Sequence, residues 1–252
     1  MTNPATHNYL ILYWIIFAII LFPVLFFVKQ PYGRHFRKGW GPSISNRIGW
    51  VIMEIPSLII ISYLFIVSRN FTATVTLLFA LWFIHYFNRT LIFPFRIKTK
   101  GKKMPLIIVL FAIIFNIINA SFNGIYLSKT PDFPYFSTTD FIRFGLGFLL
   151  FASGMIINLS SDNILIGLRK NSTTGYQIPQ KGMFQWVSCP NYLGEIIEWV
   201  GFAMMAWNLA ALSFAIWTVV NLLPRAIDNH KWYRQYFADY PGNRKAILPF
   251  IL

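Results

Sequence analysis

The chain has 252 residues, of which 56% are hydrophobic and 19% aromatic, while only 12% are charged. That charged share is about half of an ordinary soluble domain's, so the composition excludes a disordered chain and argues against a soluble globular domain. With so few charged residues, we interpret the net charge of +14 as basic loops of a membrane protein beside anionic lipid, and expect no nucleic-acid partner. The single cysteine, Cys189, excludes an intrachain disulfide and a cysteine-based metal site, and we expect no metal.

Seven segments are apolar and long enough to cross the hydrocarbon core of a bilayer, which takes about 20 residues. The first segment has no basic stretch before it, so we interpret it as a retained helix rather than a signal peptide. The sequence therefore predicts an all-α membrane protein with seven transmembrane helices. The expected spans are residues 8–28, 48–68, 72–95, 105–127, 141–160, 191–208 and 209–227.

The basic residues are distributed to one side of these spans. They gather in the connections 29–47, 96–104 and 161–190 and after the last span, whereas the other connections hold only Arg69 and Lys129. This alternation predicts an outside N-terminus and a cytoplasmic C-terminus. We expect residues 1–252 to form a single domain that is monomeric. Because no soluble domain precedes the first span, we favour a bacterial cytoplasmic membrane over the endoplasmic reticulum.

Several ionisable side chains fall inside the expected spans, where each costs about 2.5–3.5 kcal/mol and is a functional candidate. Their spacing groups them on helix faces, since residues three or four apart are neighbours on a helix. Tyr86 and Arg89 share one face, and a second polar stripe runs along the sixth span. The ionisable candidates are Glu54, His85, Tyr86, Arg89, Glu195 and Glu198, and the neutral Asn191 belongs to the same stripe as the last two.

Each of these residues also has a structural interpretation. Glu54 could form a buried bridge with Arg89, and Glu198 could bond a neighbouring helix. His85 is more often a satisfied core histidine than a ligand. Asn158 and Asp162 could only cap the end of the fifth span. The convergence of carboxylate, phenol and guanidinium on adjacent spans favours a functional interpretation.

No soluble nucleotide-binding or hydrolase motif is present in the sequence. A nucleotide cofactor would therefore be held inside the helix bundle. The basic and amide residues of 158–191 and 225–244 could hold its phosphates and ribose.

The C-terminal third carries runs that resemble one family, the steroid 5α-reductases (3-oxo-5α-steroid 4-dehydrogenases). The resemblance is dense from about 150 to 252, sparse but correctly ordered from 50 to 90, and absent from the first span. It rests on residues 188–199, 224–226, 230–233, 239–241 and 244–250, on 154–158, 161–162, 168–170 and 176–179, and on 85–89 with Glu54.

The resemblance implies a reductase that uses NADPH to reduce the Δ4 carbon–carbon double bond of 3-oxo-Δ4 steroids, with hydride transfer to C5. It implies that Glu54 and Tyr86 engage the substrate ketone, with Met53 beside them, and that the cofactor-binding half is about 150–252. The apolar steroid would enter from the bilayer. The residues that match cofactor-binding positions are Arg89, Asn158, Asp162, Arg169, Tyr176, Asn191, Glu195, Arg225, Asn229 and Tyr233.

Two residues depart from the family pattern. Met53 stands where many steroid reductases have Gln, and Asn229 stands where His is common. Both departures affect the preferred substrate and the affinities more than the type of reaction.

The chemistry of Glu54 and Tyr86 suits an enone reduction. Negative charge develops on the ketone oxygen as hydride reaches the β-carbon, and a donor aimed at that oxygen stabilises the transition state. Tyr86 is the candidate donor. Glu54 is either a protonated donor itself or an acceptor that fixes the Tyr86 rotamer.

Three other functions are compatible with the sequence. A membrane enoyl-thioester reductase would share the cofactor end but needs more basic residues at its substrate mouth. A membrane methyltransferase has a similar Pro-Asn-Tyr run but binds S-adenosylmethionine. A transporter or channel would explain intramembrane charge alone, but no pore-like repeat supports it.

Overall fold

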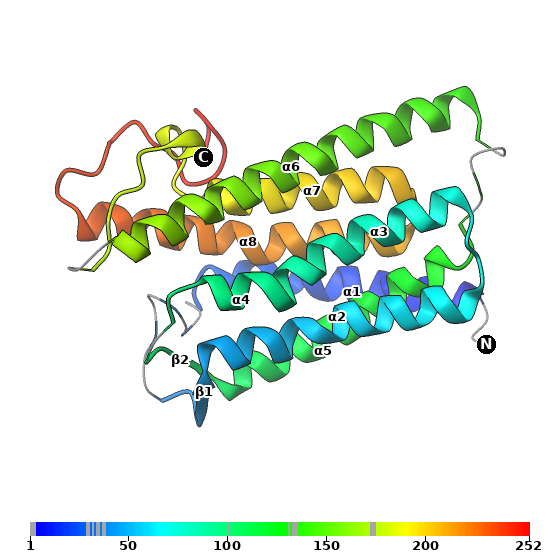
Figure 1. Ribbon diagram of the computed structural model, residues 1–252, viewed down its shortest axis with the longest axis horizontal. Helices are drawn as coiled ribbons and strands as arrows, with labels where there is room; N and C mark the ends of the chain where they lie inside the picture. Colours follow the sequence, from blue (N-terminus) through cyan, green and yellow to red (C-terminus); the bar gives the residue numbers. More distant parts are fainter. Residues whose placement is uncertain are drawn as a thin grey trace. The chain divides into compact units, whose positions relative to one another are not determined.

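The computed structural model describes residues 4–28, 31, 33, 36, 39–99, 101–130, 132, 136–171 and 175–252. The described chain is mostly helical (Figure 1), which confirms the all-α expectation. Its α-helices are α1 Pro4–Leu25, α2 Asn46–Ser68, α3 Ala73–Phe87, α4 Phe93–Arg96, α5 Leu106–Leu127, α6 Thr138–Asn171, α7 Pro190–Ala206 and α8 Leu209–Tyr236. The shorter elements are the π-helix η2 Asn88–Ile92, the 3₁₀-helix η4 Gly182–Gln185, and the antiparallel strands β1 Ser43–Ser45 and β2 Lys103–Pro105.

Within the described residues, six helices are long and apolar enough to cross a membrane, which indicates an integral membrane protein. Helix α7 is not among them, because it has only 17 residues. The seven-span count and the orientation of the termini therefore stay predictions. The six candidates are Thr6–Leu25, Asn46–Ser68, Ala73–Arg96, Leu106–Leu127, Thr138–Arg169 and Leu209–Tyr236.

Two helices extend well beyond the spans that hydropathy predicts. Helix α6 continues past residue 160 to Asn171, and α8 continues past residue 227 to Tyr236. Apolar length reports where a helix meets lipid, whereas backbone hydrogen bonding continues wherever no stop signal intervenes. Asn158 and Asp162 therefore lie inside α6, so the interpretation of these residues as helix caps is wrong.

The chain divides into two compact units, each discontinuous in sequence. Unit 1 comprises Met1–Lys29, Leu146–Met204 and Leu212–Leu252, and unit 2 comprises Gln30–Gly145 and Met205–Ala211.

In unit 2, helices α2 and α5 run in the same direction. Asn116 of α5 contacts Met53 of α2, and further along a Cβ on Gly124 would meet the side chain of Leu64. Helix α3 returns antiparallel to α2, and the indole of Trp82 donates a hydrogen bond to the Ser57 carbonyl at 3.3 Å. These contacts fix the relative height of side chains on the three helices.

In unit 1, helices α6 and α7 approach each other through glycines. A Cβ on Gly154 would meet the backbone of Glu198, and a Cβ on Gly194 would meet the backbone of Asn158. Only glycine allows the two backbones to come so close. The polar side chains of both helices are therefore held beside a nearly backbone-to-backbone contact.

Candidate functional site

The proposed catalytic pair lies on two neighbouring helices of unit 2. Glu54 is on α2, and Tyr86, which is only 4% exposed, is on α3. The Tyr86 ring stacks on Trp82 at 5.2 Å, and Trp82 is tied to α2 through Ser57, one turn beyond Glu54. Since α3 runs antiparallel to α2, one turn from Trp82 brings Tyr86 to the height of Glu54.

Asn116 of α5 joins this pair, although the sequence analysis did not single it out. Its Nδ2 donates to the Met53 carbonyl at 2.5 Å and lies 3.4 Å from Oε2 of Glu54. Asn116 and Met53 are 4% and 7% exposed, so these bonds are shielded from water. The available signal was the spacing of Asn116, Asn119 and Asn123 along an otherwise apolar span, which places three amides on one helix face.

Arg89 lies in the π-helix that follows α3. Its guanidinium carbon is 4.8 Å from the Trp50 ring centroid and 4.9 Å from that of Phe93, a cation–π arrangement. Pro94, which has no N–H to donate, lies two residues after the π-helix and favours the wider turn. Short π-helical segments inside α-helices are frequent at functional sites. His85 is 4% exposed and packs its ring edge-on to Tyr86.

Four of the predicted cofactor residues form one hydrogen-bonded network in unit 1. The amide of Asn158 donates to the Asn191 carbonyl at 2.9 Å and lies 3.4 Å from Oε2 of Glu195. The amide of Asn191 donates to Oδ1 of Asp162 at 3.2 Å. The network joins α6 to α7 beside their glycine contact, so the sequence grouping of these residues corresponds to a real cluster.

The other predicted cofactor residues of unit 1 lie on α6, on α8 and beside them. The half-buried Arg169 is on α6, and the half-buried Arg225 is on α8. Tyr176 packs edge-on against Trp232 at 4.9 Å. The remaining two are Asn229, whose amide lies 3.5 Å from the Tyr192 hydroxyl, and Tyr233, which is 3% exposed.

The C-terminal segment of unit 1 is bonded to the residues before α7. Ser188 Oγ lies 2.6 Å from Nδ1 of His230 and 2.7 Å from the Tyr240 hydroxyl. Backbone bonds run alongside, including Ser188 N–H to the Lys245 carbonyl at 2.8 Å. Burial raises the pKa of Tyr240 above its ordinary value. We call this group (Ser188, His230, Tyr240 and Lys245) the C-terminal clasp.

Arg244 adds further bonds between the C-terminal segment and residues 179–180, which precede α7. It is 4% exposed and donates to the Pro179 carbonyl at 2.9 Å and to Oε1 of Gln180 at 2.8 Å. These bonds fix the backbone just after Tyr176. The run 176–179 was singled out in the sequence, but its partner Arg244 was not assigned a role.

The residues of unit 1 fit a nicotinamide dinucleotide by their chemistry. Arg169 and Arg225 supply fixed positive charge of the kind that pairs with phosphates. The amides and carboxylates of the network supply donors and acceptors for ribose hydroxyls and a carboxamide. The set contains both the cations and the neutral polar groups that such a cofactor requires.

Comparison with known proteins identifies the family of this chain. The family described as 3-oxo-5-alpha-steroid 4-dehydrogenase matches residues 102–252. Steroid 5-alpha-reductase DET2 of Solanum lycopersicum is 41% identical over 97% of this chain and 96% of its own length. 3-oxo-5-alpha-steroid 4-dehydrogenase 1 of Homo sapiens is 40% identical over 87% of this chain and 85% of its own.

A further relative is the DET2 protein of Arabidopsis thaliana, 41% identical over 90% of both chains. These relatives come from plants and a mammal and give no support to the bacterial origin and bacterial membrane favoured from the sequence. The resemblance seen in the motifs extends over nearly the whole chain. The chain therefore belongs to the 3-oxo-5-alpha-steroid 4-dehydrogenase family of oxidoreductases.

Proposed function

We propose that this protein reduces the Δ4 double bond of 3-oxo-Δ4 steroids to 5α-3-oxosteroids, with NADPH as the reductant. The observation that carries the proposal is identity of about two residues in five, over nearly the full length, with steroid 5-alpha-reductases of plants and mammals. The clustering of Asn158, Asp162, Asn191 and Glu195 supports it.

The substrate side of the proposal rests on Tyr86, Glu54 and Asn116. The Tyr86 hydroxyl donates to the steroid ketone oxygen and stabilises the negative charge that develops there. Glu54 engages the same ketone or holds the Tyr86 hydroxyl in its rotamer. Asn116 limits the motion of Glu54, because the same amide is bonded to the Met53 carbonyl. Met53, the residue before Glu54, packs its side chain with Met104 and Val109, and we propose that this apolar group also contacts the steroid.

The cofactor side of the proposal rests on residues of unit 1, and the family resemblance adds Arg89. NADPH, when bound, supplies the hydride for C5 of the steroid. Arg169 and Arg225 hold its phosphates, and the network of Asn158, Asp162, Asn191 and Glu195 orients its polar groups. Tyr176, Asn229 and Tyr233 complete the set.

The proposed topology has seven spans, an outside N-terminus and a cytoplasmic C-terminus, with one domain acting as a monomer. It supports the function because the basic connections and the C-terminal segment then meet cytoplasmic NADPH. The steroid, being apolar, enters from the bilayer.

The test is NADPH oxidation by the detergent-solubilised protein with progesterone or testosterone, the product being identified by mass. A gain of two hydrogens at the Δ4 bond with matching loss of NADPH is the expected result. NADPH binding without turnover of either steroid would point to an enoyl thioester or another sterol. A melting temperature raised by S-adenosylmethionine and not by NADPH would overturn the proposal.

A further inference from the structure

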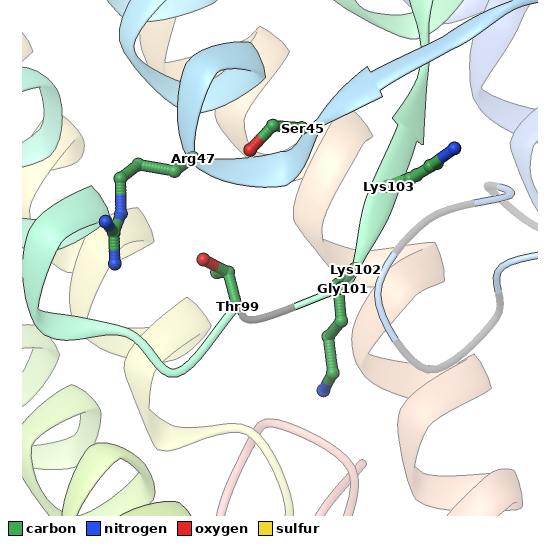
Figure 2. A pocket seen from close by; sticks show the side chains of 6 residues that line it. All are labelled: Ser45, Arg47, Thr99, Gly101, Lys102 and Lys103. Atoms are coloured by element: carbon green, nitrogen blue, oxygen red, sulfur yellow. The ribbon is translucent and has the colours of Figure 1, made fainter.

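A cavity of about 510 Å³ opens beside the strand pair of unit 2. Its six described lining residues include three cations and two hydroxyl side chains, and none of the six is acidic. Figure 2 shows the hydroxyls of Ser45 and Thr99 and the guanidinium of Arg47 around one open space. Such a set of groups suits an anion with several oxygen acceptors. The lining residues are Ser45, Arg47, Thr99, Gly101, Lys102 and Lys103.

The position of the cavity along the chain gives its depth relative to a bilayer. Strand β1 ends at Ser45, and the candidate span of α2 begins at the next residue. Strand β2 ends at Pro105, and the candidate span of α5 begins at the next residue. The cavity therefore lies where two spans begin, which is the depth of lipid headgroups.

The start of α2 adds to the positive potential of the cavity. The first N–H groups of a long helix carry partial positive charge and favour an anion. Ser45 is the N-cap residue, and its hydroxyl makes no capping hydrogen bond to the described helix. That hydroxyl can therefore donate to a ligand in the cavity.

Apolar side chains adjoin the basic groups. The Arg47 Nε donates to the Pro94 carbonyl at 3.1 Å, and its guanidinium carbon lies 5.5 Å from the Phe95 ring centroid. Phe95 is 59% exposed, and Ile48, which follows Arg47, is 53% exposed. A ligand with both an anionic head and an apolar tail matches these adjoining basic and apolar surfaces better than a soluble anion does.

We propose that this cavity, the headgroup pocket, binds the phosphate of an anionic phospholipid whose acyl chains lie along Ile48 and Phe95. Phosphate oxygens accept from Ser45, Thr99 and Arg47, and the two lysines provide the surrounding positive field. A zwitterionic phosphatidylcholine fits less well, because its trimethylammonium group would meet the same cations. The site is independent of the proposed reductase activity.

The experiment measures lipid binding to the full-length protein in detergent, by native mass spectrometry and by the shift in unfolding temperature. The probes are phosphatidylglycerol and phosphatidylcholine with identical acyl chains. The test variant is Lys102→Gln/Lys103→Gln. The matched control is Arg69→Gln/Lys129→Gln, which removes the same charge at exposed positions after the other ends of α2 and α5.

We expect wild type to prefer phosphatidylglycerol, and the lysine variant to lose about 25-fold in affinity, roughly fivefold per cation at a membrane surface. The control pair should bind as wild type does. If the lysine pair fails to fold, Lys103→Gln alone, at an exposed position of β2, gives the same comparison with the smaller loss.

Three results would overturn the assignment. Equal affinity for the two lipids would show that the headgroup pocket does not discriminate lipids by headgroup charge. An equal loss in the control pair would show a general charge effect. Displacement of phosphatidylglycerol by inorganic phosphate or by NADPH would make the pocket a site for a soluble phosphate group.

Discussion

The amide of Asn116 lies 3.4 Å from the Glu54 carboxylate while it donates to the Met53 carbonyl, so α5 holds the acidic side chain of α2 in place. Replacing the amide with an apolar group of similar size should free that carboxylate. We expect Asn116→Leu to lower kcat/KM for a 3-oxo-Δ4 steroid roughly tenfold, since a hydrogen bond to a charged group contributes about 1.5–3 kcal/mol. The affinity for NADPH should not change. Steady-state kinetics and NADPH-dependent melting measure the two effects separately.

Asn123→Leu is the matched control, on the same face of α5. Asn123 donates to the Asn119 carbonyl at 3.0 Å and lies two turns along α5 from Asn116, so its loss should lower stability more than it changes kcat/KM. Equal kinetic losses in both variants would show that Asn116 acts only through packing.

The second prediction concerns the donor to the ketone. Tyr86→Phe keeps the ring that stacks on Trp82 and removes only the hydroxyl. We expect kcat to fall about 10²–10³-fold, the usual cost of one oxyanion donor, with little change in unfolding temperature. Glu54→Gln should also reduce turnover strongly. Full activity of both variants would remove the assigned roles from this pair.

The polar clusters could be predicted from the sequence, but the ends of the helices could not. The i, i+4 spacing of Asn158 with Asp162 and of Asn191 with Glu195 follows from helix geometry, and the structure joins these four residues by hydrogen bonds. Hydropathy cannot report where α6 ends, because its last turns are helical without being apolar.

Contacts between residues far apart in the sequence could not be predicted either. Asn116 carries no charge, so it was not among the candidates predicted within its apolar span. The bonds of Ser188 and of Arg244 join segments more than 40 residues apart in sequence, and no local pattern predicts such pairs. Only the folded structure identifies these partners.

The third prediction tests the network of unit 1. Asn191→Ala removes one hydrogen bond that Asp162 accepts, at a carboxylate that is only 7% exposed. We expect NADPH to bind roughly tenfold more weakly, because a hydrogen bond to a charged group contributes about 1.5–3 kcal/mol. Asn163→Ala, at an exposed position of α6, is the control. Unchanged cofactor affinity in Asn191→Ala would separate the network from the cofactor.

The fourth prediction uses the glycine contact between α6 and α7. A Cβ at position 194 would meet the backbone of Asn158 and of Gly154, so Gly194→Ala should destabilise the protein by about 1–3 kcal/mol. Gly167→Ala, on α6, meets nothing within 4 Å and should be stabilising by up to about 1 kcal/mol. Thermal unfolding in detergent compares them, and equal effects of the two substitutions would contradict the close approach.

The fifth prediction concerns alkaline pH and the C-terminal clasp. Burial raises the pKa of Tyr240 above that of an unfolded tyrosine, about 10. Its contribution to folding is therefore fully present below about pH 10 and is lost as pH rises through the higher folded value, because the unfolded chain releases this proton first. Tyr240→Phe should be less stable than wild type at pH 7, since the bond to Ser188 at 2.7 Å is lost. The stability of this variant should fall less steeply than that of wild type above pH 10. Unfolding temperatures from pH 7 to pH 11 measure this, with exposed Tyr236→Phe as the control for general tyrosine ionisation. If the slopes of wild type and Tyr240→Phe coincide, the clasp does not hold Tyr240 protonated.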